Sequence, residues 1–564
     1  MNRLGLRLGL TLTMVVTLMN LAAPVTPARA QEPDDYVPDE VVVKLFQATD
    51  LAGLASDYAL EPLDQFGARP IYRLRIVDGT APPDRAAALA ADPRVAYAEP
   101  NFRGQAPEGQ QQVSWAKGDE GGDYEEQWAV SMIRLPEAHT VTRGAGVTVA
   151  VLDTSVDLTH PALAGRLVSG YDFVDMDADP GEVGAPDQNV VYGHGTHVAG
   201  LVALVAPEAR IMPVRVLDSD GVGNIWVIAE ALAYAVNPDG DLNTDDGVDV
   251  INLSLSTDHH THLLAEIEDD VTCSDDDQNE DDEGCLAGQS QHGAVVVAAA
   301  GNSGSSTPEY PAAEGVAGSL AVGASTPADT LASFSNYGPW VHVTAPGENI
   351  LSSVPGGEYG VWSGTSMATP LAAGQAALVR AADPGLDAAA VVKRIIETSA
   401  DIGGLVPLRI DAAAALGIPL VTISGEYMCM DTLGPIMVDN LLVSQGHTCT
   451  LVGTRVQGNV KVEAGATLNA SGINVKGSLQ VKGAASVNVT DSTVSGSVQV
   501  EESGSARLDS SQIHGGAQFV KNTGSLTISN NTIGGNLQCK ENDLTPTGRG
   551  NLVQGNKEEQ CSGL

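Results

Sequence analysis

VTVAVLDTSVD, residues 147–157, begins with a continuous run of apolar and β-branched residues, which ends at Asp153. Continuous apolar runs of this length are typical of parallel strands that are covered on both faces of a sheet. Similar runs recur along the chain, and helical patterns lie between and after them. The strand-like runs are 210–216, 248–255, 294–299 and 319–324, and the helical patterns are 224–236 and 369–382. We therefore expect an α/β domain with a parallel sheet and helices on both faces over residues 127–417.

Three short segments of this region carry the residue types that nucleophilic catalysis needs. Asp153 follows a strand, and active sites of open α/β sheets lie at that edge. His194 lies in GHGTHVAG, residues 193–200, where small residues allow close approach. Ser366 lies in SGTSMATP, residues 363–370, at the start of a helix whose N-terminus favours negative charge. Because serine needs a base and histidine needs an orienting carboxylate, these residues predict acyl transfer.

The three segments, in the order Asp, His, Ser, resemble those of the subtilisin-like serine proteases. The resemblance covers roughly residues 127–417 and implies that Ser366 is the nucleophile, His194 the general base and Asp153 its orienting carboxylate. His197 is implied to be structural. The family usually has glycine where this chain has Ser155. This chemistry requires no cofactor.

The resemblance also implies an oxyanion hole and a primary specificity pocket. Asn302, in AAAGNS after the run 294–299, is the implied side-chain donor to the oxyanion, together with the Ser366 N–H. The segment 251–256 resembles the family's edge strand that pairs with extended substrate backbone. The implied walls of the pocket are Ser254, Leu255 and Ser256 on one side and Ala299, Ala300 and Gly301 on the other. The family usually has glycine at the position of Ser256, whose side chain narrows or polarises that wall.

Glu309 precedes Tyr310-Pro311, which matches a Tyr-Pro segment of the family near the pocket floor. A carboxylate at that place favours Lys or Arg at the cleaved position of the substrate. An exposed loop glutamate is the alternative interpretation, because most glutamates lie on the surface.

Four carboxylates recur at steps of two or three residues within YDFVDMDAD: Asp172, Asp175, Asp177 and Asp179. Ca²⁺ takes several oxygen ligands from flexible loops of this kind, and some thermostable family members have calcium in this region. A structural Ca²⁺ site is one interpretation, and a solvated acidic run is the other. The inserted loop that binds calcium tightly in the family is missing, because residues 200–202 run directly into 206–208.

The N-terminal part divides into a signal peptide, a small domain and a linker. Residues 1–30 have a basic start, an apolar run and an Ala-Arg-Ala cleavage signal, as secretory signal peptides do. Residues 31–110 show the order β-α-β-α-β of a compact α+β unit, and residues 95–101 resemble the end of the family's inhibitor-like prodomain. Residues 111–126 are expected to form the linker and processing region. The precursor is expected to be cut between Asn101 and Gln127.

The last part of the chain, residues 418–564, contains a repeat. Glycines recur at 458, 477, 496, 515, 535 and 555, within short alternating strands and polar turns. A fixed period of 19 or 20 residues predicts an all-β solenoid, a parallel β-helix with one coil per repeat, and a β-sandwich is the alternative. Six cysteines in an exported chain predict disulfides, for which the short-range pairs 273–285, 429–449 and 539–561 are expected among fifteen pairings.

The formal net charge of −42 predicts a surface that repels nucleic acid and anionic membranes. No stretch after residue 30 is apolar enough for a membrane helix. The acidic segments 239–249 and 266–284 are expected to be surface insertions. We therefore expect a secreted serine endopeptidase with protein or peptide substrates and its own prodomain as inhibitor. The alternatives are an adhesion protein built around the β-helix, and an esterase, which the order of the triad disfavours.

Overall fold

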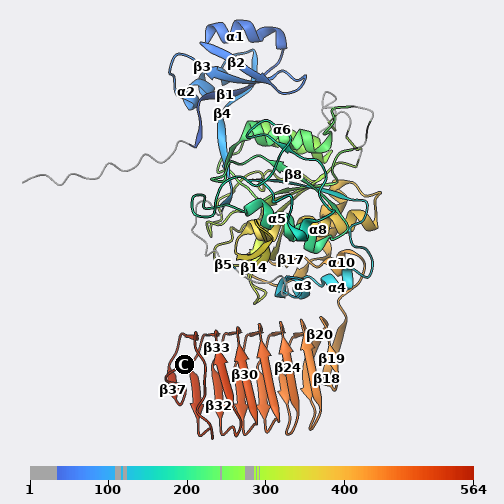
Figure 1. Ribbon diagram of the computed structural model, residues 1–564, viewed down its shortest axis with the longest axis vertical. Coiled ribbons are helices and arrows are strands. Elements are labelled where there is room, and N and C mark those ends of the chain that lie inside the picture. The colour runs from blue at the N-terminus through green and yellow to red at the C-terminus, as the bar shows by residue number, and fades with distance from the viewer. Residues whose placement is uncertain are drawn as a thin grey trace, which may run out of the picture. The chain divides into compact units, whose positions relative to one another are not determined.

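The computed structural model describes residues 35–107, 116–117, 124–241, 244, 246–273, 285–286, 289–290 and 292–564 (Figure 1). The predicted signal peptide, residues 1–30, and most of the predicted processing region, 111–126, lie outside the described residues. Within the described chain, no helix is long and apolar enough to cross a membrane.

The N-terminal domain is an antiparallel sheet covered by two short helices. Its elements are β1 (Tyr36–Leu45), α1 (Leu51–Asp57), β2 (Leu60–Gln65), β3 (Ile71–Ile76), α2 (Pro82–Ala90) and β4 (Val95–Gln105). The strand order is β2-β3-β1-β4. The predicted β-α-β-α-β order omitted β2, which contains Pro62 and lies at the edge of the sheet. An edge strand tolerates proline because one side of its backbone is unpaired, so its sequence is a weak strand signal.

The catalytic domain is built on a central sheet with the order β16-β17-β13-β12-β11-β10-β6-β8-β7, which is parallel apart from the β16–β17 pair. Its strands are β6 (Thr148–Asp153), β7 (Tyr171–Asp172), β8 (Arg210–Arg215), β10 (Val250–Leu253), β11 (Val295–Ala299), β12 (Ser319–Ser325), β13 (Val343–Pro346), β16 (Ala400–Asp401) and β17 (Leu408–Arg409). The strands predicted from the apolar runs are thus present within one or two residues of their expected bounds.

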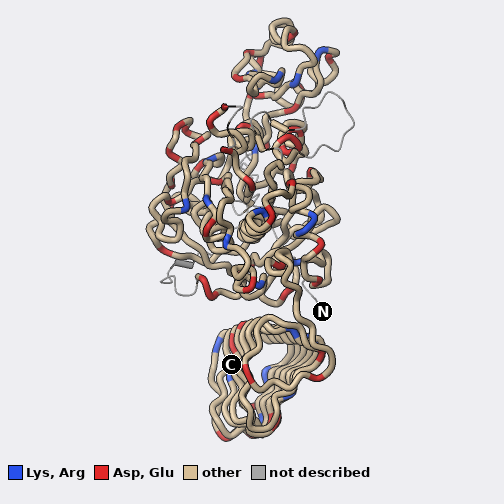
Figure 2. Tube along the Cα trace, turned by 90° about the vertical axis from the view of Figure 1, so that its right-hand side faces the viewer, with Lys and Arg blue, Asp and Glu red and all other residues tan. Residues whose placement is uncertain are grey.

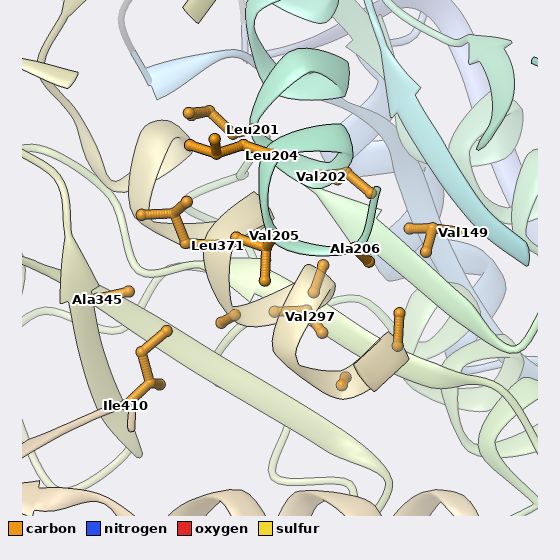
Figure 3. Packing of buried hydrophobic residues seen from close by; sticks show 14 of the residues in the cluster. Val149, Leu201, Val202, Leu204, Val205, Ala206, Val297, Ala345, Leu371 and Ile410 are labelled. Atoms are coloured by element: carbon orange, nitrogen blue, oxygen red, sulfur yellow. The ribbon is translucent and has the colours of Figure 1, made fainter. Parts of the chain in front are cut away.

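Helices cover both faces of this sheet and define two hydrophobic cores. One core contains residues of α5 (His194–Val205), α8 (Thr365–Ala382) and α9 (Ala388–Thr398). Figure 3 shows Leu201, Val205 and Leu371 of α5 and α8 in the same buried cluster as Val149 and Val297 of the sheet. The second core contains residues of α6 (Ile225–Val236) and α7 (His262–Thr272). The fully buried sheet explains why its strands read as continuous apolar runs.

Shorter elements complete the domain. They are β5 (Ala116–Lys117), α3 (Trp128–Met132), α4 (Leu135–Ala138), β9 (Val222–Asn224), β14 (Ile350–Val354), β15 (Glu358–Trp362) and α10 (Ala412–Ala415). The acidic segment 266–284 was expected to be a surface insertion, but its first part belongs to α7. Apolar residues of that helix, among them Ile267 and Val271, face the core, and Glu268 is buried beside them.

The C-terminal region forms stacked coils (Figures 1 and 2), and the coils in its middle have three strands each. The first face contains β22 (Arg455–Val456), β25 (Asn474–Val475), β28 (Thr493–Val494), β31 (Gln512–Ile513), β34 (Thr532–Ile533) and β36 (Leu552–Val553). The second contains β18 (Thr422–Cys429), β20 (Met437–Val443), β23 (Val460–Val462), β26 (Leu479–Lys482), β29 (Val498–Glu501), β32 (Ala517–Val520), β35 (Leu537–Lys540) and β37 (Lys557–Glu559). The third contains β19 (Thr432–Leu433), β21 (Thr448–Val452), β24 (Thr467–Ser471), β27 (Ser486–Thr490), β30 (Ser505–Asp509) and β33 (Leu526–Ser529).

Parallel pairing in this region joins residues one repeat apart. Val460 pairs with Leu479, Leu479 with Val498, and Val498 with Ala517. These inward residues are buried, so each coil stacks its apolar side chains on those of its neighbours. The arrangement is that of the predicted parallel solenoid. The three predicted disulfides, 273–285, 429–449 and 539–561, are all formed.

Candidate active site

Asp153 and His194 meet where a strand ends and a helix begins. Asp153 is the last residue of β6, and His194 is the first residue of α5. The His194 Nδ1–H donates to Asp153 Oδ1 over 2.7 Å, and the backbone N–H of Thr154 donates to the same oxygen over 2.7 Å. Both side chains are buried. The carboxylate thereby fixes the imidazole with its proton on Nδ1, which leaves Nε2 as the basic nitrogen.

Ser366 is held beside the substrate-binding segment by the sequence of its own helix. Pro370 has no N–H, so the Ser366 carbonyl lacks the usual acceptor role within α8. This carbonyl instead accepts a hydrogen bond from the Ser254 hydroxyl over 3.0 Å. In return, Ser366 Oγ donates to the Ser254 carbonyl over 3.4 Å. The helix turn that carries the serine is thus fixed to the segment after β10.

Asn302 lies next to this turn and is oriented by it. Its Oδ1 accepts hydrogen bonds from the Thr365 N–H over 2.8 Å and from the Thr365 hydroxyl over 2.9 Å. The amide oxygen is therefore engaged on the side of α8, and Nδ2 is the atom that serves as a donor. A side-chain amide beside a serine nucleophile is suited to stabilise an oxyanion.

Two of the predicted pocket residues, Ser256 and Gly301, lie against Glu309. Glu309 Oε2 accepts a hydrogen bond from the Ser256 hydroxyl over 2.7 Å, and Oε1 accepts one from Asn336 Nδ2 over 2.6 Å. A Cβ added at Gly301 would lie 2.2 Å from Glu309 Oε2, so only glycine leaves room for the carboxylate there. Glu309 is 8% exposed, which contradicts the exposed-loop interpretation. Burial raises the pKa of Glu309, while the bonds from Ser256 and Asn336 oppose that rise.

Asn336 is a pocket residue that the sequence did not indicate. Its Nδ2 also donates to the Ala300 carbonyl over 2.9 Å, and its Oδ1 accepts from the backbone N–H groups of Ser303 and Ser305. It links the wall after β11 to the floor formed by Glu309. No local motif marks it, because its partners lie about thirty residues away in the chain.

The end of β4 pairs with two segments of the catalytic domain, β9 and the residues around Ser256. Residues Arg103–Gln105 pair with β9, and Gln105 exchanges two backbone hydrogen bonds of 2.9 Å with Ser256. The Ala106 N–H donates to the Gly221 carbonyl over 2.9 Å. The N-terminal domain therefore places its last strand between two edges of the catalytic domain, as an extended peptide substrate would lie.

His197 has the structural environment that was expected for it. Its Nε2 lies 3.2 Å from the Ile350 carbonyl and 3.1 Å from the Gly360 carbonyl, and its ring stacks on Trp362. Burial lowers the pKa of His197 to about 3, so the ring is neutral in the working range of pH. Trp362 also contacts the His194 ring, with centroids 5.5 Å apart. It supports both histidines, and sequence reasoning did not identify it.

The four carboxylates of the predicted calcium loop do not converge. Asp172 and Asp175 both accept from Arg215 Nη1, over 2.7 Å and 2.5 Å. Asp177 and Asp179 instead accept backbone N–H groups two residues ahead, in turns of the loop. Among the described residues, no group of three or more His, Cys, Asp or Glu side chains is arranged to hold a metal ion. A buried guanidinium takes up Asp172 and Asp175, and the four residues do not fit the expected Ca²⁺ site.

The fold and this arrangement define a serine hydrolase in which the end of β4 pairs with Ser256, close to the serine. A family comparison gives the narrower class: residues 144–440 match the Subtilase family, and residues 22–101 match the Fervidolysin N-terminal prodomain. The chain belongs to the subtilase family. It is a serine endopeptidase made with an N-terminal prodomain, and the comparisons give no support to the adhesion alternative.

Individual relatives agree with this assignment. The thermophilic serine proteinase of Bacillus sp. (strain AK1) is 40% identical over 332 residues, which cover 56% of this chain and 70% of that protein. Thermitase of Thermoactinomyces vulgaris is 37% identical over 288 residues, 49% of this chain and 90% of that protein. The crystal structure of fervidolysin from Fervidobacterium pennivorans, a keratinolytic enzyme related to subtilisin, has a TM-score of 0.54 at 22% identity. It covers 70% of this chain and 64% of that chain, and supports the fold.

Proposed function

We propose that Ser366, His194, Asp153 and Asn302 are the catalytic groups of this endopeptidase. The hydrogen bond of 2.7 Å between His194 Nδ1 and Asp153 Oδ1, with Ser366 fixed on the adjoining segment, carries the proposal. Ser366 Oγ attacks the peptide carbonyl and its proton passes to His194 Nε2. The oxyanion is stabilised by Asn302 Nδ2 and the Ser366 N–H. His194 then protonates the leaving amine, and water hydrolyses the acyl-enzyme.

Labelling with a serine-directed phosphonyl fluoride tests these roles. The mature enzyme is expected to incorporate one label on Ser366, located by peptide mass spectrometry, and to lose activity in parallel. Ser366→Ala is expected to take up no label. Label on another serine, or activity that survives full labelling of Ser366, contradicts the assignment. Turnover of casein as well as of a simple ester is expected, and turnover of the ester alone argues for an esterase.

We propose that the primary pocket prefers Lys or Arg. Glu309 lies against Gly301 and Ser256, the residues expected in the two pocket walls, and its carboxylate faces both. A buried carboxylate stabilises a cationic side chain far better than an apolar one. Cleavage-site profiling with a peptide library is expected to show Lys or Arg before the cut bond, and a preference for large apolar residues there contradicts it.

We propose that the enzyme is secreted and that its strongly acidic chain avoids nucleic acid. The signal-like residues 1–30 and the three disulfides support export. Asp and Glu, red in Figure 2, recur along the described chain, and the full sequence has 71 of them against 29 Lys and Arg. Mass spectrometry of the protein in the culture medium is expected to find no peptide from residues 1–30. Intact precursor retained in the cell would contradict export.

A further inference from the structure

Glu182 lies directly behind the Asp153–His194 pair. Its Oε1 accepts hydrogen bonds from the Ser155 hydroxyl over 3.0 Å and from the Gly193 N–H over 3.2 Å. Its Oε2 accepts one from the Thr196 hydroxyl over 2.6 Å. These partners come from two different parts of the site. Ser155 belongs to the segment after β6, whereas Gly193 directly precedes α5 and Thr196 lies in its first turn.

The carboxylate therefore joins the two elements that carry the catalytic pair. Asp153 is two residues before Ser155, and His194 follows Gly193 directly. The two segments are packed tightly, since a Cβ added at Gly195 would lie 2.1 Å from the Ser155 carbonyl oxygen. Gly193 is the residue before the helix, so its N–H and the helix dipole favour a negative group at this end of α5.

Backbone pairing fixes where Glu182 lies. Gly181 forms a parallel bridge with Val156, and the Val156 N–H donates to the Pro180 carbonyl over 3.1 Å. The segment that precedes Glu182 thus runs beside the segment after Asp153. This backbone pairing holds the Cα of Glu182 close to the catalytic pair.

Burial raises the pKa of Glu182, and the bonds from Thr196, Ser155 and Gly193 oppose that rise, so the donor set favours the ionised carboxylate. A hydroxyl and an N–H donate to Oε1, and a second hydroxyl donates to Oε2. Thr196 Oγ1 is oriented for this, because it already accepts the Asp157 N–H over 2.8 Å. Asp153, Asp157 and Tyr192 are the other titratable groups that interact electrostatically with Glu182 or its neighbours. A second negative charge near Asp153 lowers the energy of a positive charge on His194.

We propose that Glu182, together with the Ser155 hydroxyl, is a positioning residue for the catalytic pair. It holds the end of β6 and the first turn of α5 in one arrangement, and its charge stabilises the imidazolium that forms when Ser366 loses its proton. The inference rests on the catalytic roles proposed above. It also accounts for Ser155 at a position where the family usually has glycine, since only the hydroxyl supplies this hydrogen bond.

The pH dependence of kcat/KM for Glu182→Gln and Ser155→Ala tests the proposal on the full-length, self-processed enzyme. Glutamine is neutral and presents N–H groups to the Thr196 hydroxyl. Glu182→Gln is expected to lower kcat by about 10-fold with little change in KM. The acidic limb of the kcat/KM profile of Glu182→Gln is expected to move to lower pH by about half a unit to one unit, because a lost negative charge disfavours the imidazolium. In Ser155→Ala the acidic limb is expected to move in the same direction by a smaller amount.

The control is Glu397→Gln, on the exposed side of α9, where Glu397 pairs with Lys393. Its profile is expected to match that of the parent enzyme, and an equal shift in this variant would overturn the proposal. So would profiles of Glu182→Gln and Ser155→Ala that superimpose on the parent while both proteins melt normally. If Glu182→Gln does not fold, Ser155→Ala alone decides the question. Failure of the catalytic assignment is recognised separately, as a parent enzyme whose Ser366 takes no phosphonyl label.

Discussion

Ser256 Oγ lies 2.7 Å from Glu309 Oε2, so the wall and the floor of the primary pocket are joined by one hydrogen bond. The two residues are 53 positions apart in the chain and come from segments after different strands. The bond keeps the carboxylate in place against Gly301. It also lets Ser256 influence the charge of Glu309, on which the proposed substrate preference depends.

Glu309→Gln is expected to remove most of the preference for basic residues. A hydrogen bond between charged groups contributes about 1.5–3 kcal/mol, so the ratio of kcat/KM for Lys against Leu substrates should fall about 10- to 100-fold. Paired peptide substrates that differ only at the cleaved residue measure this ratio. Glu397→Gln serves as the control and should leave it unchanged. A ratio that stays constant in Glu309→Gln would show that the carboxylate does not contact the substrate.

The preference for basic residues is expected to depend on pH. Burial raises the pKa of Glu309, so the carboxylate loses its charge at a higher pH than an exposed glutamate does. The Lys preference should be complete when Glu309 is ionised and should decline as the pH falls through its raised pKa. Ser256→Ala removes a donor to the carboxylate and should move the decline to still higher pH. The same ratio of kcat/KM, measured across pH, checks this, and a decline at the same pH in both enzymes would contradict it.

Pro107→Lys is expected to accelerate maturation. When the pairing of Gln105 with Ser256 is continued by two residues, position 107 faces Ser254, whose carbonyl accepts from Ser366. Proline has no N–H to donate there, whereas lysine restores the N–H and offers a cation to Glu309. Gel analysis of the precursor over time measures the rate. Pro107→Ala, which restores only the N–H, should be intermediate, and equal rates for all three proteins would rule out this register.

The stability of the precursor is expected to depend on Glu99 of the prodomain. Glu99 accepts the N–H groups of His262 and Leu263 at the start of α7, over 2.8 Å and 3.0 Å. Burial raises the pKa of Glu99 from 4.5 to about 7. The folded state therefore holds the proton on Glu99 more tightly than the unfolded state does. This tighter binding adds to the free energy of unfolding at low pH, and the addition is lost as the pH rises through 7.

Glu99→Gln, in the uncut Ser366→Ala precursor, removes that contribution. The loss of stability between pH 5 and pH 8 should be smaller than in the parent, by up to about 3 kcal/mol. Thermal unfolding at the two pH values measures it. Glu61→Gln, an exposed change in β2, should behave as the parent does. An unaltered pH dependence in Glu99→Gln would mean that other buried acids, such as Glu314, account for it.

Phe519→Ala is expected to destabilise the solenoid without impairing catalysis. Phe519 is 1% exposed in β32, between Val500 and Cys539 of the neighbouring coils. Truncating a buried phenylalanine costs about 3–5 kcal/mol, and in a repeat structure that cost stays with neighbouring coils. Calorimetry should show a transition at lower temperature with kcat/KM unchanged on short peptides. Gln518→Ala, whose side chain points outward, is the control, and parallel loss of activity would show that the two regions unfold together.

Much of the architecture could be predicted because it depends on local patterns. Continuous apolar runs marked the buried strands, and glycines at a period of 19 or 20 residues marked the coils. Strand β2 could not be predicted, because its Pro62 is tolerated only at a sheet edge, and the position at the edge is a property of the folded sheet. The last part of α7, from Glu266 onward, was misjudged for a related reason. Its acidic side chains, such as Glu266, lie against Lys44 and Arg69 of the prodomain.

The sequence by itself determined which groups we propose as the catalytic triad, because Asp153, His194 and Ser366 each lie in a short segment with its own strand or helix signal. Only the tertiary structure decided which side chains surround them. Glu182 lies 27 residues from Ser155, Asn336 lies 27 from Glu309, and Arg215 lies 43 from Asp172. A spacing in the sequence does not specify which donors reach a carboxylate. The same acidic pattern is compatible with a calcium-binding loop or with a loop whose carboxylates pair with an arginine. The folded position of Arg215, beside Asp172 and Asp175, distinguishes the two.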